Sequence, residues 1–303
     1  MVSRDSGWAL ASTPHGSVVL RTTDGGTDWH NVSPHGIWPL SSAQIAANEN
    51  FGIGREGIDC YGLSGQACWV AMISEFDQIV VEQTQDGGRH WTKSQFANHT
   101  GYWLLLSFLD GRHGWILTVS DMASGSTAKE LFATKDGGRT WATVTKTIPN
   151  HIDPNGMTFR NASVGWLAAG YHGSDQVPFY RTDDGGRHWR LLELDTAEIF
   201  KQEDRYGIVH PPAFFGLKRR DGLLPVQFRV TISPMGLYQT RDGGDTWRLT
   251  ALIPGLGRAD TCQFLTLKRG WITENLGEPA SKLLRTQDGG RHWHVVYPKQ
   301  KEL

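Results

Sequence analysis

The sequence predicts an all-β protein, a six-bladed β-propeller whose blades are four-stranded antiparallel sheets. Three observations support this: the segment Thr-x-Asp-Gly-Gly-x-x-Trp occurs six times, a Gly-Trp marker precedes most copies, and no window has a helical period. A meander of about 50 residues cannot bury both faces alone, so the copies must stack on one another. Radial stacking gives a propeller, which protects the sheet edges that an open array would expose.

The repeat extends along almost the whole chain of 303 residues. Its copies begin at Thr22, Thr84, Thr134, Thr182, Thr240 and Thr286. Together with the Gly-Trp markers, these copies contain 11 of the 13 tryptophans, which explains the excess of this residue. We expect one propeller domain over 1–303, with blades at about 1–33, 41–95, 103–146, 155–195, 210–251 and 258–298.

Each repeat predicts the same order of strands. An inner strand ends near a Phe, as at Phe108, Phe159 and Phe264, and a polar turn follows it. The second strand begins at the marker, which in the fifth repeat is the weaker Gly222-Leu223. The third strand ends at the repeat's Thr, and the fourth, outer strand begins at its Trp after the Asp-Gly-Gly turn.

The eight-residue segment from Thr to Trp, here called the acidic turn, is expected to stabilise the fold. Its Asp can accept backbone N–H bonds from the residues after it, while the two Gly adopt positive φ without steric cost. The Trp has enough surface to pack on the hairpin or on a neighbouring blade. We assign structural roles to Asp24, Asp86, Asp136, Asp184, Asp242 and Asp288, and to Trp29, Trp91, Trp141, Trp189, Trp247 and Trp293.

Composition and charge argue against several classes of partner. The formal net charge is -1, so no global field attracts nucleic acid. No apolar run approaches the roughly 18 residues that a membrane span requires, so we expect no membrane insertion. The 12 His are scattered without metal-ligand spacing, so we expect no metal and no cofactor.

Four acidic turns carry an Arg after the second Gly. Equivalent turns lie on one side of a propeller, so these residues should form a partial basic rim, interrupted by Thr27 in the first blade and Asp245 in the fifth. Such a rim could dock an acidic protein partner, and the alternative is that these are ordinary solvated turn charges. The basic rim consists of Arg89, Arg139, Arg187 and Arg291.

The repeated segment resembles the Asp box, or bacterial neuraminidase repeat, written Ser/Thr-x-Asp-x-Gly-x-x-Trp. All six copies match at all four positions, so the resemblance implies an Asp box in every blade of a sialidase-like fold. With its markers, the pattern looks most like the photosystem II stability/assembly factor-like propellers. Members of that family are typically secreted or lumenal non-enzymatic scaffolds, and the photosynthetic ones have seven blades. The resemblance implies a non-catalytic scaffold that binds a protein partner.

Sialidases share this repeat, so a glycoside hydrolase or a glycan-binding propeller is the alternative. Such an enzyme would need an arginine triad, a Tyr nucleophile with a Glu partner, and an acid/base Asp. The nearest suitable residues are Glu203, Arg205 and Tyr206, close to His210, although a solvated loop also explains this run. It lies in one of two long insertions, 195–212 and 41–67, which we interpret as surface loops for partner recognition or as simple excursions.

The cysteines bear mainly on the compartment. Cys60 and Cys68 bracket a short loop that could close as a disulfide, which would favour an oxidising location, and two reduced buried thiols are the alternative. The start of the chain, Met1 to Asp5, has no apolar stretch after its charges and cannot act as a secretory signal. With the family resemblance, we expect an extracytoplasmic protein whose leader is absent from this sequence; a cytosolic protein is the alternative.

Overall fold

The computed structural model describes residues 1–13, 16–34, 57–74, 78–98, 101–120, 127–149, 151–172, 177–194, 206–228, 234–254, 256, 259–275 and 281–297. The chain divides into two compact units. The first unit comprises 1–151 and 184–188, and the second comprises 152–183 and 189–303. All regular structure in the described residues is β-strand, so none of them forms a helix that could span a membrane.

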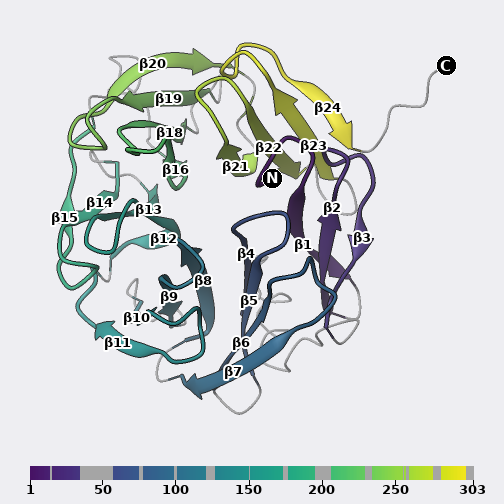
Figure 1. The fold of residues 1–303 in the computed structure, drawn as a ribbon. Helices are drawn as coiled ribbons and strands as arrows, with labels where there is room; N and C mark the ends of the chain where they lie inside the picture. The colour runs from purple at the N-terminus through teal and green to yellow at the C-terminus, as the bar shows by residue number, and fades with distance from the viewer. Residues whose placement is uncertain are drawn as a thin grey trace. The chain divides into compact units, whose positions relative to one another are not determined.

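The first unit contains three antiparallel sheets, each built from consecutive strands (Figure 1). One has three strands, in the order β1-β2-β3, and two have four, in the orders β4-β5-β6-β7 and β8-β9-β10-β11. The strands are β1 (Gly7–Thr13), β2 (Gly16–Thr22), β3 (His30–Asn31), β4 (Ile58–Gly62), β5 (Cys68–Ile73), β6 (Gln78–Thr84), β7 (Thr92–Ala97), β8 (Trp103–Phe108), β9 (Gly114–Val119), β10 (Lys129–Thr134) and β11 (Ala142–Thr145).

The second unit contains a nine-stranded sheet and a four-stranded sheet, β21-β22-β23-β24. The larger sheet joins β12–β15 to β16–β20. The strands are β12 (Asp153–Phe159), β13 (Gly165–His172), β14 (Phe179–Thr182), β15 (Arg190–Leu191), β16 (Tyr206–Val209), β17 (Ala213–Phe215), β18 (Asp221–Phe228), β19 (Met235–Thr240), β20 (Arg248–Ile253), β21 (Ala259–Phe264), β22 (Gly270–Asn275), β23 (Ser281–Thr286) and β24 (His294–Tyr297).

The repeat predicts the strand boundaries closely. The third strand of every repeat ends at the Thr of its acidic turn, and the inner strands β8, β12 and β21 end at the three predicted Phe. The second strands begin at the markers, or one residue before the marker in β18. The outer strands begin one residue after the Trp, as β7 does at Thr92. The prediction of successive four-stranded antiparallel sheets of the β-propeller type is therefore confirmed.

The prediction of six separate four-stranded sheets is wrong in two places. Within the described residues the first sheet has three strands, and the fourth and fifth repeats share one sheet. They are joined because the short β14 covers only Gly165–Ala168 of β13. The remaining edge, Gly170–His172, pairs with β16, which itself pairs with β18. An unpaired length of strand edge offers backbone N–H and C=O groups that a neighbouring strand can bind.

The interpretation of both insertions as loops throughout is also wrong. The end of the first insertion forms β4, the inner strand of its sheet, and the second contributes β16. Asp59 lies in the inner strand β4, where its carboxylate accepts the N–H of Leu106 from β8 at 2.7 Å. A partner in the adjacent sheet therefore allows an acidic residue in this inner strand.

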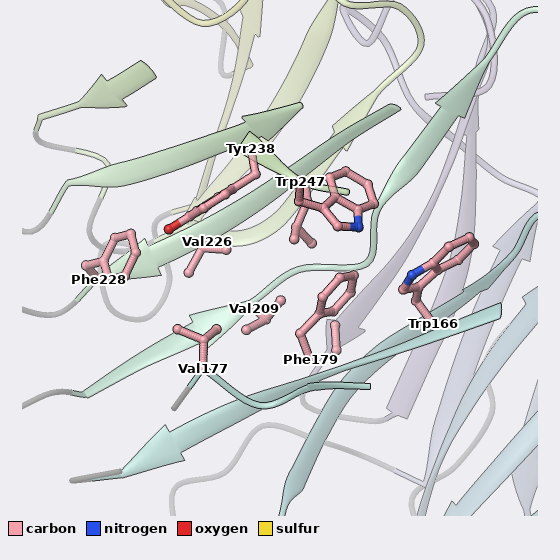
Figure 2. Close-up of a cluster of buried hydrophobic side chains, with 10 residues drawn as sticks. Trp166, Val177, Phe179, Val209, Val226, Phe228, Tyr238 and Trp247 are labelled. Carbon is pink, nitrogen blue, oxygen red and sulfur yellow. The ribbon is translucent and has the colours of Figure 1, made fainter. Parts of the chain in front are cut away.

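Apolar clusters lie between strands of consecutive repeats within each unit. Figure 2 shows one of them in the second unit, where side chains from β13 and β14 point toward those of β16, β18 and β19. Phe179 and Val226 in this cluster are fully buried, and Trp247 from an acidic turn is also a buried member of it. Such packing supplies the burial that one meander lacks.

All three cysteines are free thiols in the structure. Val70 lies opposite Cys60, and Gly62 lies opposite Cys68, so the two cysteines are diagonal neighbours across β4 and β5. Diagonal Cα atoms in such a pair lie about 7–8 Å apart, beyond the roughly 6.8 Å that disulfides usually span. Cys60 and Cys68 are therefore two reduced thiols, as the alternative prediction states, and they do not form a disulfide.

Candidate functional site: the acidic turns and their arginines

The acidic turn is held by one Asp and one Thr side chain. In the third repeat, Oδ1 of Asp136 accepts the backbone N–H groups of Arg139 at 3.1 Å and Thr140 at 3.0 Å. The hydroxyl of Thr134 donates to the same oxygen at 2.8 Å and accepts the N–H of Gly138 at 2.9 Å. The second carboxylate oxygen accepts the hydroxyl of Thr140 at 2.6 Å. Both oxygens of the carboxylate are thus used within the turn.

In all five other copies the Asp also accepts the backbone N–H of the seventh residue, whose side chain varies. Where the seventh residue is His, its Nδ1 lies 2.6 Å from the second Asp oxygen, in the pairs His90–Asp86, His188–Asp184 and His292–Asp288. Both Gly have positive φ in all six copies. In four copies the Trp side chain also donates to the carbonyl of the second Gly, namely in Trp29, Trp91, Trp141 and Trp293.

These bonds keep the turn carboxylates ionised. The hydroxyl and the N–H of Thr140 lower the pKa of Asp136 to about 2. The pKa values of Asp24, Asp86, Asp242 and Asp288 are lowered as well, with backbone and side-chain hydrogen bonds as the cause. A carboxylate that already binds its own turn and stays charged is poorly suited to act as a general acid.

We expect Asp136→Ala to lower the free energy of unfolding by about 1–3 kcal/mol, because it leaves turn amides without their acceptor. Since the folded-state pKa is depressed, this stabilisation is present above about pH 3.8 and is lost as the pH falls toward 2. Urea unfolding at neutral pH measures the loss. Asp136→Asn keeps one acceptor oxygen and should lose less. An unchanged unfolding midpoint in Asp136→Ala would show that the turn does not need its carboxylate.

The first Gly of the acidic turn ties it to the turn that follows the inner strand. The N–H of Gly137 donates to the carbonyl of Arg112 at 2.8 Å, and Gly243 donates in the same way to Arg220 at 2.8 Å. The same bond occurs at Gly25, Gly87 and Gly289. Both turns of a repeat therefore lie at one end of its sheet.

Two marker tryptophans of the first unit connect their repeats to the next acidic turn. Nε1–H of Trp69 donates to the carbonyl of Gly137 at 2.8 Å, and that of Trp115 donates to the carbonyl of Gly185 at 3.3 Å. Because Cys68 and Thr84 pair directly, Trp69 also lies beside its own acidic turn. In the first unit, Trp69 thus links the acidic turns of the second and third repeats, and Trp115 contacts the acidic turn 184–188.

The residue just before the repeat's Thr also belongs to the site, although it was not predicted from the sequence. It lies opposite the marker Trp in the antiparallel register, as Arg181 lies opposite Trp166. The Arg181 guanidinium stands 5.6 Å from the Trp166 ring and forms ion pairs with Asp183 and Asp245. Asp245, which interrupts the basic rim, thus neutralises a buried Arg. The sequence does contain a pattern that could have identified this position, because it is Arg or Gln in five of the six repeats.

The four arginines of the basic rim are exposed. Arg89, Arg139 and Arg187 lie in the three turns of the first unit that the marker tryptophans connect. Their backbones are fixed by the acidic turns, as the bond from Arg89 N–H to Asp86 shows at 3.1 Å. Arg291 occupies the equivalent position in the second unit. Exposed guanidinium groups on fixed backbones suit the binding of carboxylates, although that of Arg187 also donates to the carbonyl of Asp184 at 2.9 Å.

Of the glycosidase candidates, only the backbone of Tyr206 lies within the described residues. Glu203 and Arg205 lie outside the described residues. The backbone of Tyr206 begins β16 and pairs with His172. His210 is 2 % exposed, and its Nε2 has no hydrogen-bond partner among the described residues. Those residues also contain no group of three or more His, Cys, Asp or Glu that could hold a metal ion.

His210 should make the stability depend on pH. Burial lowers its pKa from 6.5 to about 4, so the unfolded chain takes up a proton at a higher pH than the folded chain does. The stabilisation is full above about pH 6.5 and is lost as the pH falls toward 4, by about 3 kcal/mol in total. Urea unfolding at about pH 7.5 and pH 5 measures this change. His210→Phe should flatten the dependence, and an equal dependence in both proteins would rule out His210 as its source.

Comparison with known proteins shows similarity in structure but not in sequence. No family model and no curated protein matches the sequence. YCF48 bound to a D1 peptide is 16% identical, with a TM-score of 0.51 over 97% of this chain and 80% of that chain. Aleuria aurantia lectin in complex with Fucalpha1-6GlcNAc is 10% identical, with a TM-score of 0.60 over 97% and 95% of the two chains. The Hadza microbial sialidase Hz136 is 14% identical, with a TM-score of 0.53 over 87% and 58%.

These similarities show the β-propeller fold. They include a peptide-bound protein, a lectin and a sialidase, so the fold is compatible with each function that the repeat suggests. Function must therefore be argued from the residues of this chain.

Proposed function

We propose that this protein is a non-catalytic, six-bladed β-propeller scaffold that binds an acidic protein partner through its basic rim. The observation that carries the proposal is that the Asp and Arg side chains of the acidic turns have different roles. Their Asp side chains bind backbone amides, as Asp136 does, whereas the neighbouring Arg side chains are exposed. The turn is stabilised internally and presents a cation outward.

The same proposal includes six blades and an extracytoplasmic location. Six acidic turns, each followed by an outer strand, support six blades, with the shared nine-stranded sheet supplying two of them. The resemblance to the Asp-box scaffolds supports an extracytoplasmic location. The free thiols of Cys60 and Cys68 add no support for an oxidising compartment.

Panning a random peptide library on the full chain tests the proposed function. We expect the enriched peptides to be acidic and to bind at least tenfold more weakly after Arg89, Arg139 and Arg187 are changed together to Glu, with the melting temperature unchanged. Changing the same three residues to Lys keeps the charge and should preserve most of the binding. Equal binding by wild type and the Glu variant would reject the basic rim as the partner surface.

The glycan alternative is tested in parallel on the same protein. A glycan array and fluorogenic sialosides should give no binding and no turnover if the scaffold proposal is right. Turnover that is abolished by Tyr206→Phe or Glu203→Gln would replace the scaffold with a glycoside hydrolase.

A further inference from the structure

A second candidate surface is formed by two turns of the second unit. One turn connects β17 to β18, and the other connects β21 to β22. We call them the turn pair, comprising 215–221 and 265–269. They contribute a shallow pocket of about 320 Å³, lined by Phe215, Gly216, Asp221, Thr266, Leu267 and Lys268. This volume lies at the lower end of the range for ligand sites and suits one large side chain.

Both turns are fixed before any partner arrives. Gly216 and Arg219 have positive φ, and the N–H of Arg219 donates to the carbonyl of Gly216 at 3.1 Å. In the other turn, the hydroxyl of Thr266 accepts the N–H groups of Lys268 and Arg269 at 3.2 and 3.0 Å. Gly243 and Gly289 bind these turns to the acidic turns of their own repeats. A preformed pocket lowers the entropic cost of binding.

The turn pair exposes apolar side chains beside this pocket. Four large apolar side chains are exposed in the described part of the chain, and two of them, Leu217 and Leu267, belong to the turn pair. Leu217 is 106% exposed near the tip of its turn. One exposed leucine is unremarkable, but two beside an apolar pocket favour an interaction site.

Positive charge surrounds the same pocket. The turn pair carries five basic residues and one carboxylate, that of Asp221. Lys218, Arg220, Lys268 and Arg269 are exposed and form no ion pair with any described residue. Arg219 donates to the carbonyl of Arg160 at 3.3 Å. Unpaired cations around an apolar pocket complement an apolar side chain flanked by carboxylates.

We propose that the turn pair binds a short acidic segment of a partner protein, with one bulky apolar side chain in the pocket between Phe215 and Leu267. The flanking carboxylates meet Lys218, Arg220, Lys268 and Arg269. This goes beyond the proposed function, because it adds a second set of contact residues and the chemistry of their ligand. The geometry favours a peptide over an anionic membrane, since a pocket receives a side chain whereas membrane binding requires several apolar groups that project outward.

Fluorescence anisotropy with labelled peptides and the full chain tests this proposal. The first peptide has a central Phe among Asp and Glu, the second replaces Phe by Ser, and the third replaces the acids by Asn and Gln. We expect the first to bind and the other two to bind at least tenfold more weakly. The variant Leu267→Ser/Lys268→Glu should weaken binding of the first peptide at least tenfold. The matched control is Leu252→Ser/Arg248→Glu, two exposed residues of β20, which should leave it unchanged.

The outcomes separate this surface from the basic rim and from a lipid surface. Changing Arg89, Arg139 and Arg187 to Glu should leave binding of the first peptide within twofold of wild type. If only that rim variant loses the peptide, the turn-pair proposal is wrong and the basic rim is supported. Failure of the first peptide to bind, or equal binding of the Phe and Ser peptides, overturns the proposal. Flotation with phosphatidylserine vesicles that is lost in Leu267→Ser/Lys268→Glu, without peptide binding, assigns the surface to lipid instead.

Discussion

Replacing Gly244 by alanine should destabilise the protein by about 2–5 kcal/mol, more than a turn glycine ordinarily would. Two costs add at this position. Its φ of +88 is unfavourable for a residue with a Cβ, by about 1–2 kcal/mol. The new Cβ would also lie 2.3 Å from a ring carbon of Trp166, a fully buried residue, and displacing such a ring costs about 1–3 kcal/mol more.

Gly216→Ala is the matched control for Gly244→Ala. It has a φ of +73, and a Cβ there would meet nothing within 4 Å, so only the backbone cost of about 1–2 kcal/mol applies. Urea unfolding of both variants at neutral pH separates the two costs. Equal losses in the two variants would show that the added Cβ meets no rigid Trp166 ring at Gly244.

Trp69→Ala should cost about 3–5 kcal/mol, the usual penalty for removing a buried aromatic side chain. Trp69 is fully buried and stacks on Phe108 with ring centroids 4.0 Å apart. Its Nε1–H donates to the carbonyl of Gly137 in the following repeat at 2.8 Å. The substitution therefore removes both the packing and the polar contact between two sheets.

Trp69→Phe divides the effect of Trp69 into two parts. The Phe retains most of the stacking surface but leaves the Gly137 carbonyl without this donor, which should cost about 1–3 kcal/mol. Calorimetric melting of the two variants measures both losses. If Trp69→Ala costs no more than Trp69→Phe, stacking on Phe108 is not what holds these sheets together.

Much of the fold could be predicted because the repeat is a local signal. Thr, Asp and two Gly within a few positions determine where a strand ends and how its turn closes, and the structure places all six third-strand ends at that Thr. The strand β4 was missed inside the first insertion, where the partner of its Asp59 is not local in the sequence. The Leu106 amide that binds Asp59 is 47 residues away.

The candidate site was predictable to a smaller extent, for the same physical reason. The arginines of the basic rim are visible in the turn sequence itself. The ion pair of Arg181 with Asp245 joins residues 64 positions apart, and the turn pair brings Phe215 beside Leu267. Such pairings depend on the packing of consecutive repeats, which a single copy of the repeat does not specify.

A crystal structure of the full chain tests the central proposal most directly. We predict six blades around one axis in a closed ring, two of them sharing the nine-stranded sheet, with all six acidic turns at the same end and the arginines of the basic rim exposed there. An open stack of sheets, or acidic turns at opposite ends of neighbouring sheets, would contradict both the propeller and the basic rim.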